Sequence, residues 1–555
     1  MNRIVPAIFA MLFAALSVAQ TPTPKKTLRI SVSSPPTTLD PARIIDPLHQ
    51  RHLQQSFESP LRAAVDGQGR IAIVAGLCEW LPVGTSKTVV RLRVLPGARF
   101  HDDACFEGGK GRDVAPRDVV FSLLRIADPE IPSPAWKLFL EGRIEGLDAW
   151  RESAERNRVA DYDAPPKGLA VDGDAVIVTL VKPYPQLRAL LTQTWASIVP
   201  VEAFRRYGRD LSDHPIGTGP FRVVERTATV TRFVRHTDGR RVHAGNIDEL
   251  RLEPVSEPQD VATRFLAGEL DAVELLSAHV KHFLNADRTI LPAMRGKGVS
   301  MVPALPLTTA YLGFNYGSPV LSKKGVREAL AFALDRDAIV KVGFTGFAKK
   351  VDSPLPTALP EHDMVKNVPW VYAKRDLARA KEALAKEGFG PANPLPPIDF
   401  LFADFGDPRV SKAAELIVKQ AGDAGITLTP RVETIGPFMD RLGKSEFGVV
   451  WASWFADYPD AENFFQLFTT DALNGSWGAN YGRYASTRVD SLYGEFAGLE
   501  PGLPRMNVSG RLLEAVRADL PWIPIAEISE WILIGKGVRG FAPHLLDWCL
   551  GGVSK

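Results

Sequence analysis

A chain of 555 residues is too long for a single hydrophobic core, because cores stop growing at about 250–300 residues, and two or three lobes are expected. Its 45% hydrophobic and 23% charged residues exclude a chain that is disordered throughout. The 66 basic and 64 acidic side chains nearly balance, so the charge gives no reason to expect a nucleic acid or an anionic membrane as the partner.

The N-terminus has the pattern of a cleavable export signal. Asn2-Arg3 gives a positive start, Ile4–Leu16 is almost continuously apolar, and Ser17–Ala19 supplies small residues for a signal peptidase. The apolar stretch is shorter than the roughly 20 residues that a membrane-spanning helix needs. We therefore predict a signal peptide at residues 1–19 and a soluble mature protein in the periplasm, with a retained anchor as the alternative. The cleavage region has no cysteine for lipid attachment.

The first half of the chain contains several segments with the two-residue period of a strand. Thr27–Val32 and Lys87–Val94 alternate polar and apolar side chains, and Ala175–Val181 is a third such segment. Arg232–Val242 is expected to be a hairpin that turns at its Asp-Gly pair. Its arginines are expected to be solvated on the outward face rather than to bind nucleic acid.

The second half interleaves helical periods with strands. The expected helices are Pro258–Leu266, Val326–Leu334, Arg375–Lys386 and Val410–Ala421, and the expected strands are Asp271–Leu276 and Ile426–Val432. This alternation predicts α/β lobes with partly parallel sheets. No low-complexity tether separates the lobes, so the chain is expected to cross between them more than once and to form a hinge.

Neither the cysteines nor the histidines form the pattern of a metal site. Cys78, Cys105 and Cys549 cannot all pair, and an oxidising compartment would allow, without requiring, a Cys78–Cys105 disulfide. His49 and His52 have helical spacing but lack a glutamate and a third ligand, so we expect two surface histidines.

The motifs of common secreted enzymes are absent from the sequence. There is no G-x-S-x-G nucleophile elbow and no H-E-x-x-H zinc helix. The run Gly108–Gly111 lacks the spacing and the hydroxyl residue of a phosphate-binding loop. Catalysis has no positive signal, although a pair of glycosidase carboxylates that meet only in the folded chain stays open.

Seven short segments, in order over nearly all of the mature chain, resemble the oligopeptide/dipeptide/nickel family of ABC-transporter solute-binding proteins, extracellular family 5. No single segment identifies the family, but the seven segments in this order do. The segments are Thr37–Pro41, Arg91–His101, Asp118–Arg125, Pro215–Phe221, Tyr311–Asn315 with Val326–Ile339, Trp454–Asp460 and Pro521–Pro524.

The resemblance implies an α/β fold of the periplasmic-binding-protein type II, with two lobes that close on a cleft and an inserted third lobe. Lobe I would comprise residues 27–62, 197–306 and 519–555, lobe II would be the insertion 63–196, and lobe III would be 307–518. The chain crossings would lie near Leu307–Asn315 and Ala518–Glu527. The segment 104–117, which carries Cys105, is longer than the family's usual link and suggests a decoration particular to a sub-branch.

The function implied by the resemblance is capture of peptides or similar amine-bearing solutes and their delivery to the permease subunits of an ABC importer in the inner membrane. The protein would be a monomer without a cofactor, a metal or an enzymatic activity. The alternatives are a receptor of the same family for a sugar, metal chelate or opine, a receptor used for signalling, and a secreted hydrolase.

The candidate cleft lies at the end of an apolar strand that begins near Gly448. Its polar and aromatic continuation would emerge at the carboxyl end of the strand, where open α/β sheets bind ligands. By resemblance to the family's Trp-x-x-Asp string, Asp457 would pair with the ammonium group of a peptide and Trp454 would form a wall. The alternative is that Asp457 caps a helix that begins near Pro459.

Three further residues are less specific candidates for the cleft, because tyrosine and asparagine also serve ordinary loops. They are Asn315, Tyr458 and Tyr481. Asp40 is weaker still, since it can simply shape the turn before Pro41. The sequence does not identify an arginine for a ligand carboxylate.

Overall fold

The computed structural model describes residues 25–555 apart from 33, 45–46, 67–68, 239–244, 256, 277–278, 286–287, 305–306, 345, 405–407, 474–478 and 542–548. The predicted signal peptide, residues 1–19, lies outside the described residues. Within them, no helix combines the length and the apolar character that crossing a membrane requires.

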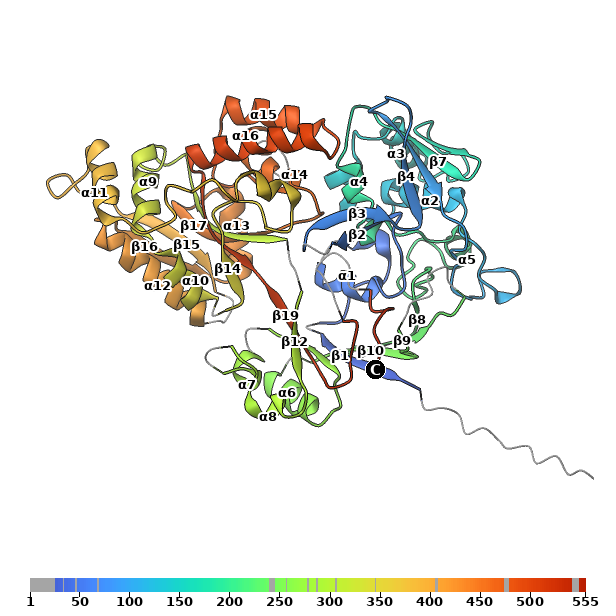
Figure 1. Cartoon of the computed structure of the whole chain (residues 1–555). Helices are drawn as coiled ribbons and strands as arrows, with labels where there is room; N and C mark the ends of the chain where they lie inside the picture. The colour runs from blue at the N-terminus through green and yellow to red at the C-terminus, as the bar shows by residue number, and fades with distance from the viewer. Residues whose placement is uncertain are drawn as a thin grey trace, which may run out of the picture.

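A seven-stranded sheet is built from both ends of the chain and from its middle (Figure 1). Its strand order is β12 (Ser300–Ala304), β19 (Glu530–Ile534), β11 (Ala272–Glu274), β1 (Thr27–Val32), β10 (Glu249–Pro254), β9 (Thr231–Arg235) and β8 (Phe221–Arg226). β1 runs parallel to both of its neighbours, β10 and β11, and the other pairs are antiparallel. The short helices α6 (Pro258–Leu266), α7 (Val280–Phe283) and α8 (Pro292–Arg295) bury one face of its β11–β19 end.

A smaller, wholly antiparallel sheet comes from the first third of the chain. Its order is β4 (Cys78–Pro82), β5 (Val89–Val94), β7 (Ala175–Thr179) and β6 (Leu169–Asp172). Helix α2 (Pro116–Ala127) packs against it, and α3 (Leu147–Asn157), α4 (Leu187–Leu190) and α5 (Val201–Tyr207) complete the unit. The hairpin of β2 (Leu61–Val65) and β3 (Ile71–Ala75) precedes it, and α1 (Pro47–Leu53) precedes the hairpin.

A six-stranded mixed sheet organises the second half of the chain. Its order is β14 (Ala348–Lys350), β18 (Trp522–Ile528), β13 (Thr308–Phe314), β17 (Val449–Phe455), β15 (Ile398–Ala403) and β16 (Leu428–Glu433). One face packs on α9 (Lys324–Ala333), α10 (Arg336–Gly343), α11 (Leu377–Lys386) and α12 (Pro408–Asp423). The other face carries α13 (Ile435–Lys444), and α14 (Glu462–Phe465), α15 (Thr487–Ala497) and α16 (Leu503–Asp519) follow β17.

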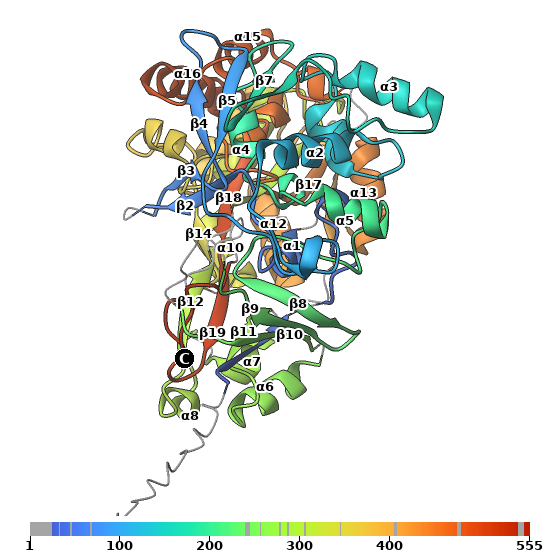
Figure 2. The ribbon, with the colours of Figure 1, turned by 90° about the vertical axis from the view of Figure 1, so that its right-hand side faces the viewer.

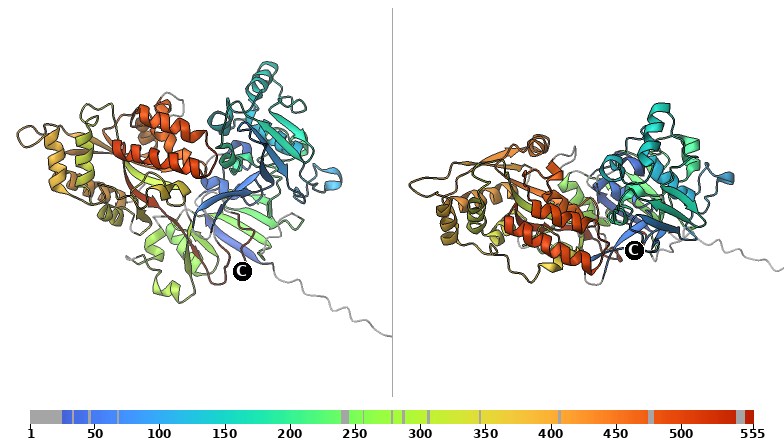
Figure 3. Two further views of the ribbon diagram at one scale, coloured as in Figure 1. Left: turned by 45° about the horizontal axis from the view of Figure 1, so that its top comes forward. Right: turned by 90° about the horizontal axis from the view of Figure 1, so that it is seen from above.

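The chain passes twice between the seven-stranded and the six-stranded sheet. It leaves through β12 into β13 and returns through β18 into β19, with Ser529 as the single residue between the last two strands. Figure 2 shows β18 and β19 one below the other, leading from the upper unit to the lower sheet. Figure 3 shows the units of the six-stranded and the four-stranded sheets on opposite sides of the molecule.

The α/β fold class is confirmed, and so are several individual elements. β1 has the predicted bounds, and β5 buries Val90, Leu92 and Val94 on one face. α6 also has its predicted bounds, with Val261 and Phe265 in the core and Leu266 exposed at its end.

Three sequence-based expectations need correction. The strand β9 ends at Arg235 and pairs with both β8 and β10, so the hairpin predicted within Arg232–Val242 is wrong, and part of its expected turn lies outside the described residues. The α9 helix ends at Ala333, one residue before the expected Leu334. His52 is buried in the core, not at the surface. The disulfide between Cys78 and Cys105, which the sequence left open, does not form in this structure.

Candidate functional site

The parallel strands β15, β16 and β17 end at one edge of the six-stranded sheet, and the candidate residues follow β17 there. The first half of β17 is buried, Trp454 is half-buried, and Phe455 at the end is exposed. Asp457 comes two residues later and is also exposed. The predicted emergence of a polar, aromatic segment from a buried strand is confirmed.

The carboxylate of Asp457 reaches solvent and has no positively charged partner. Asn463 Nδ2 donates a hydrogen bond to its Oδ2 at 3.0 Å, while Oδ1 accepts none from the part of the chain that the structure describes. The described residues likewise give Asp457 no ion pair. Desolvation by the surrounding protein raises the pKa of Asp457, and the hydrogen bond from Asn463 opposes the rise. The carboxylate is therefore open to solvent on one side, partly desolvated by the protein and not neutralised by a cation of the described residues. Such a group is suited to bind a positively charged solute.

The carboxylate of Asp457 does not cap a helix. The nearest helix, α14, begins at Glu462, and the backbone N–H of Glu462 donates to Asp460 Oδ1 at 2.8 Å. The N-cap of α14 is Ala461, and the side chain that accepts from this N–H belongs to Asp460, not to Asp457.

Asn463 belongs to the candidate site by its contacts, and the sequence did not identify it. Its Oδ1 accepts from Trp454 Nε1 and from the backbone N–H of Asp457, each at 3.0 Å, while its Nδ2 binds the Asp457 carboxylate. The only signal in the sequence was its place six residues after Asp457, inside the string that follows Trp454.

Tyr481 lies close to this cluster. Its half-buried ring packs against the same group of side chains as Trp454 and Tyr311, on the α13 face of the sheet. Burial, with a contribution from the negative charge of Asp457, raises the pKa of Tyr481. The structure thus brings Trp454, Asp457 and Tyr481 together, from segments that are separated by an intervening helix.

Tyr458 points away from this cluster into a seam between two units. Its ring is buried and lies edge-on to Phe139 of the four-stranded-sheet unit, with centroids 5.8 Å apart. Its hydroxyl donates to the carboxylate of Glu462, and burial raises its pKa well above the usual value. Tyr458 was predicted as a residue of the cleft; in this structure its ring is a packing contact across the seam.

Other contacts join the same two units. Gln186 Nε2 donates to the backbone oxygen of Ala497 at 3.1 Å, and the Ile71 backbone N–H donates to Ala358 O at 3.0 Å. Arg70 of the β2–β3 hairpin also forms an ion pair with Asp363. In this structure the units that face each other therefore touch directly.

The loop between Asp457 and Asn463 is anchored by buried charges. Arg505 of α16 is almost fully buried and pairs with Asp460, with Nη1–Oδ2 at 3.0 Å, and with Glu361 at 3.5 Å. The Glu462 carboxylate accepts hydrogen bonds from the hydroxyls of Tyr458 and Tyr493, and burial raises the pKa of Glu462. Such a network fixes the backbone from which Asp457 projects.

Asn315 lies at the opposite end of β13 from this cluster. Its Nδ2 donates to the backbone oxygens of Ser445 and Phe447 at 2.9 and 2.8 Å, and its Oδ1 accepts from the Gly317 N–H. Since β13 pairs antiparallel with β17, Phe314 faces Val449 while Thr308 faces Phe455. Asn315 therefore organises a distant loop and does not join Asp457, contrary to the expectation.

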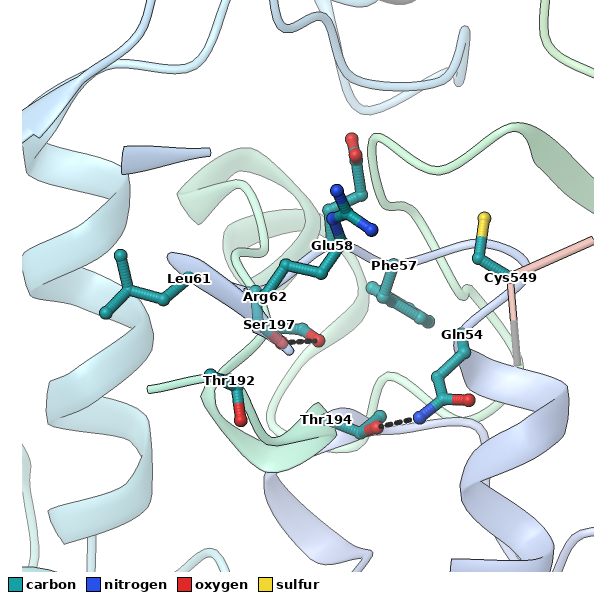
Figure 4. Close-up of a pocket in the computed structure, with 10 residues that line it drawn as sticks. Gln54, Phe57, Glu58, Leu61, Arg62, Thr192, Thr194, Ser197 and Cys549 are labelled. Carbon is teal, nitrogen blue, oxygen red and sulfur yellow. Dashed lines mark hydrogen bonds between the residues drawn. The ribbon is translucent and has the colours of Figure 1, made fainter. Parts of the chain in front are cut away.

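A separate small cavity lies between β2 and the segment that follows α4 (Figure 4). Its polar lining includes Gln54, Ser59, Thr194 and Ser197, where Gln54 Nε2 donates to Thr194 Oγ1 at 3.4 Å and the two serine hydroxyls are 3.3 Å apart. A volume of about 40 Å³ holds a few water molecules and no larger solute. Among the described residues no cluster of His, Cys, Asp and Glu could hold a metal ion.

Comparisons with known proteins agree with this architecture. The model of the family "Bacterial extracellular solute-binding proteins, family 5 Middle" matches residues 74–476. The glutathione-binding protein GsiB of Pectobacterium atrosepticum is 24% identical over 92% of this chain and 90% of its own, and heme-binding protein A of Haemophilus influenzae is 23% identical over 85% and 82%. The structure of the periplasmic binding protein DppA from Helicobacter pylori with the peptide STSA superposes with a TM-score of 0.71 at 19% identity, covering 95% of this chain and 98% of that one.

Proposed function

Because the chain belongs to the family 5 bacterial extracellular solute-binding proteins, we propose that it captures peptides or similar amine-bearing solutes and delivers them to the permease of an ABC importer in the inner membrane. The observation that carries the choice of solute is Asp457. It is a carboxylate at the carboxyl ends of parallel strands, partly desolvated, with one oxygen free of hydrogen bonds from the described residues and no described cation beside it.

The ligands of the relatives leave this choice open. Glutathione and the peptide STSA carry an α-amino group, whereas heme carries none. A solute without a cation would leave Asp457 as an uncompensated charge when the cleft closes, which costs several kcal/mol. An ammonium group instead neutralises it, with the rings of Trp454 and Tyr481 as flanking walls.

We further propose that the three sheets mark three lobes. The seven-stranded sheet would be lobe I, from residues 27–62, 197–306 and the C-terminal return, with lobe II at 63–196 and lobe III from 307. Because β18 pairs within the six-stranded sheet, the return to lobe I fits Ser529 better than residue 519. Two strand-to-strand crossings would form the hinge about which lobe III closes.

We also propose a non-catalytic role outside the cytoplasm. We propose that the mature chain begins after the signal peptide at residues 1–19, works as a periplasmic monomer and releases its solute intact. A soluble chain that shuttles between solute and permease would need neither a cofactor nor a second subunit.

The test uses a defined mixture of tri- and tetrapeptides and the same mixture after exhaustive N-acetylation. Native mass spectrometry of the mature protein should show retained, uncleaved peptides from the first mixture and none from the second. Equal retention of acetylated peptides, or no retention from either mixture, would contradict an amine-bearing solute, and cleavage products would contradict a receptor.

The Asp457→Asn variant tests the residue itself on a peptide that the first experiment retains. Titration calorimetry should show an affinity loss of at least about a hundredfold, because a buried ammonium without its counter-charge costs about 3–5 kcal/mol. The matched control is Glu382→Gln, which removes an exposed carboxylate on α11, on the other face of the same sheet. Its affinity should equal that of the wild type.

A further inference from the structure

Asn463 is fully buried and bonds to Trp454 and Asp457, two of the three residues that the proposed function assigns to the solute. Its backbone N–H donates to Asp460 O at 3.1 Å, so the residue sits on the turn that Arg505 anchors through Asp460. The backbone on which Asn463 stands is therefore fixed independently of any solute.

The side-chain amide of Asn463 then holds two neighbouring residues, Trp454 and Asp457, through hydrogen bonds. One oxygen accepts two N–H groups, from the Trp454 indole and from the Asp457 backbone, and the nitrogen donates to one Asp457 carboxylate oxygen. Asparagine is the smallest side chain that offers an acceptor and donors on one planar group. An ionised aspartate lacks the donor, and a leucine of similar size lacks both.

As a consequence, the two carboxylate oxygens of Asp457 have different surroundings. Oδ2 is held by Asn463, and Oδ1 is left without a hydrogen bond among the residues that the structure describes. The indole ring of Trp454 is held by the same amide, which fixes the ring relative to the open oxygen.

We infer that Asn463 is a positioning residue, which fixes Trp454 and Asp457 in the orientation that receives an ammonium group and does not touch the solute itself. The inference rests on the proposed function, because it concerns the same site. It explains why a buried amide binds both residues of the Trp-x-x-Asp string at once.

The first test is Asn463→Leu, which removes all three hydrogen bonds. The affinity for the retained peptide should fall about ten- to a hundredfold, the usual effect of losing a hydrogen bond to a charged group. The hydrogen bond favours the ionised form of Asp457, so its loss should raise the pKa of Asp457 and move the acidic midpoint of peptide binding to higher pH. A residue with a merely structural role would lower the melting temperature and leave that midpoint in place.

The matched control is Asn315→Leu at the other end of β13. The Asn315 side chain also makes three hydrogen bonds, two donated and one accepted, but to a distant loop. This variant should lose stability and keep both the peptide affinity and the acidic midpoint of the wild type.

A second variant keeps the test decisive if Asn463→Leu does not fold. Asn463→Asp preserves an acceptor for Trp454 and for the Asp457 backbone, and it replaces the donated bond by a second carboxylate. Two carboxylates at this distance do not ionise together easily, so the pair should titrate in two steps, the upper one above the wild-type pKa of Asp457.

Two measurements need no peptide and separate this inference from the proposed function. The carboxyl ¹³C signal of Asp457, assigned with Asp457→Asn, reports its titration, and the indole ¹H–¹⁵N signal of Trp454 reports its hydrogen bond. Both should change in Asn463→Leu. If both stay as in the wild type, the inference fails even where peptides bind; if both change while no peptide binds, only the proposed function fails.

Discussion

Two aspartates three residues apart have opposite environments. Asp460 is buried, paired with Arg505 and bonded to the N–H of Glu462, whereas Asp457 is exposed and bonded only to Asn463 among the described residues. The first is satisfied in the folded protein and contributes to its stability. Asp457 lacks a counter-charge among the described residues. A partly desolvated charge without a partner is unfavourable, and in a receptor the solute can supply the missing charge.

At the same scale, His101 makes stability depend on pH. It is fully buried, donates from Nε2 to Gly219 O at 2.9 Å and lies edge-on to the ring of His236, and burial lowers its pKa to about 3. The unfolded chain takes up a proton near the ordinary value of 6.5 while the folded chain does not. The stability that neutral His101 allows is therefore complete above pH 6.5 and is lost as the pH falls toward 3.

The prediction is a slope of about 1.4 kcal/mol per pH unit from this residue near pH 5. His52, whose pKa burial also lowers to about 3, should contribute a similar slope. Urea unfolding between pH 5 and 7 should show a shallower dependence in His101→Gln, even if that variant is less stable at pH 7. An unchanged slope would show that His101 takes up its proton equally in both states.

At residue scale, the sequence identified part of the candidate site. Trp454 and Asp457 were chosen as candidates because a strand of clear apolar character precedes them and they match a string of the family. Asn463 was missed because one asparagine in a short helix gives no signal until its two partners are placed. Tyr458 and Asn315 were also predicted for the cleft, but the sequence could not show that Tyr458 packs across the seam and that Asn315 bonds a loop. Both residue types can line a cleft or stabilise a loop, and tertiary packing decides which.

At the scale of elements, long periodic segments were predictable and pairings were not. β1, β5 and α6 followed from their periods, because one face of each is buried against a core. The pairing of β9 with β8 and β10 could not be predicted from the period, because β10 begins fourteen residues after β9 ends. The hairpin of β2 and β3 was not predicted at all, although Ala63 and Ile71 pack with the core of the six-stranded-sheet unit.

The loop after β17 connects the site to the seam, and this predicts a separable effect of Tyr458. Tyr458→Ala deletes the ring that meets Phe139, so the open arrangement should gain population and the peptide should bind about tenfold more weakly without losing a direct contact. Tyr458→Phe keeps the ring and loses only the hydroxyl bond to Glu462. It should lower the unfolding free energy by about 1 kcal/mol or more and leave the affinity unchanged.

Titration calorimetry and single-molecule energy transfer between the two units can check both variants. Equal affinities and equal distance distributions in Tyr458→Ala and Tyr458→Phe would mean that the seam contact does not contribute to closure.

At the scale of the whole molecule, the absence of a tether in the sequence was informative. It predicted repeated crossings, and the chain does pass from β12 into β13 and back from β18 into β19. What the sequence alone could not specify was the contact across the seam. That contact depends on Gln186 with Ala497 and on Ile71 with Ala358, pairs that lie hundreds of residues apart.

If the two crossings act as the proposed hinge, the molecule should change shape when the solute binds. A solute shifts an open–closed equilibrium only by contacts that one state has and the other lacks, and Asp457 lies beside Tyr458, the residue that contacts the opposite unit. A saturating peptide should therefore reduce the radius of gyration in small-angle scattering toward the value expected for this structure, in which the units touch. At a hundred times its dissociation constant it should also add about 2.7 kcal/mol of stability.

The control is Asp457→Asn at the same peptide concentration. This variant should stay expanded and become compact only at peptide concentrations above its own, weaker dissociation constant. A wild-type protein that calorimetry shows to be saturated, but whose scattering is unchanged, would mean that recognition does not require closure.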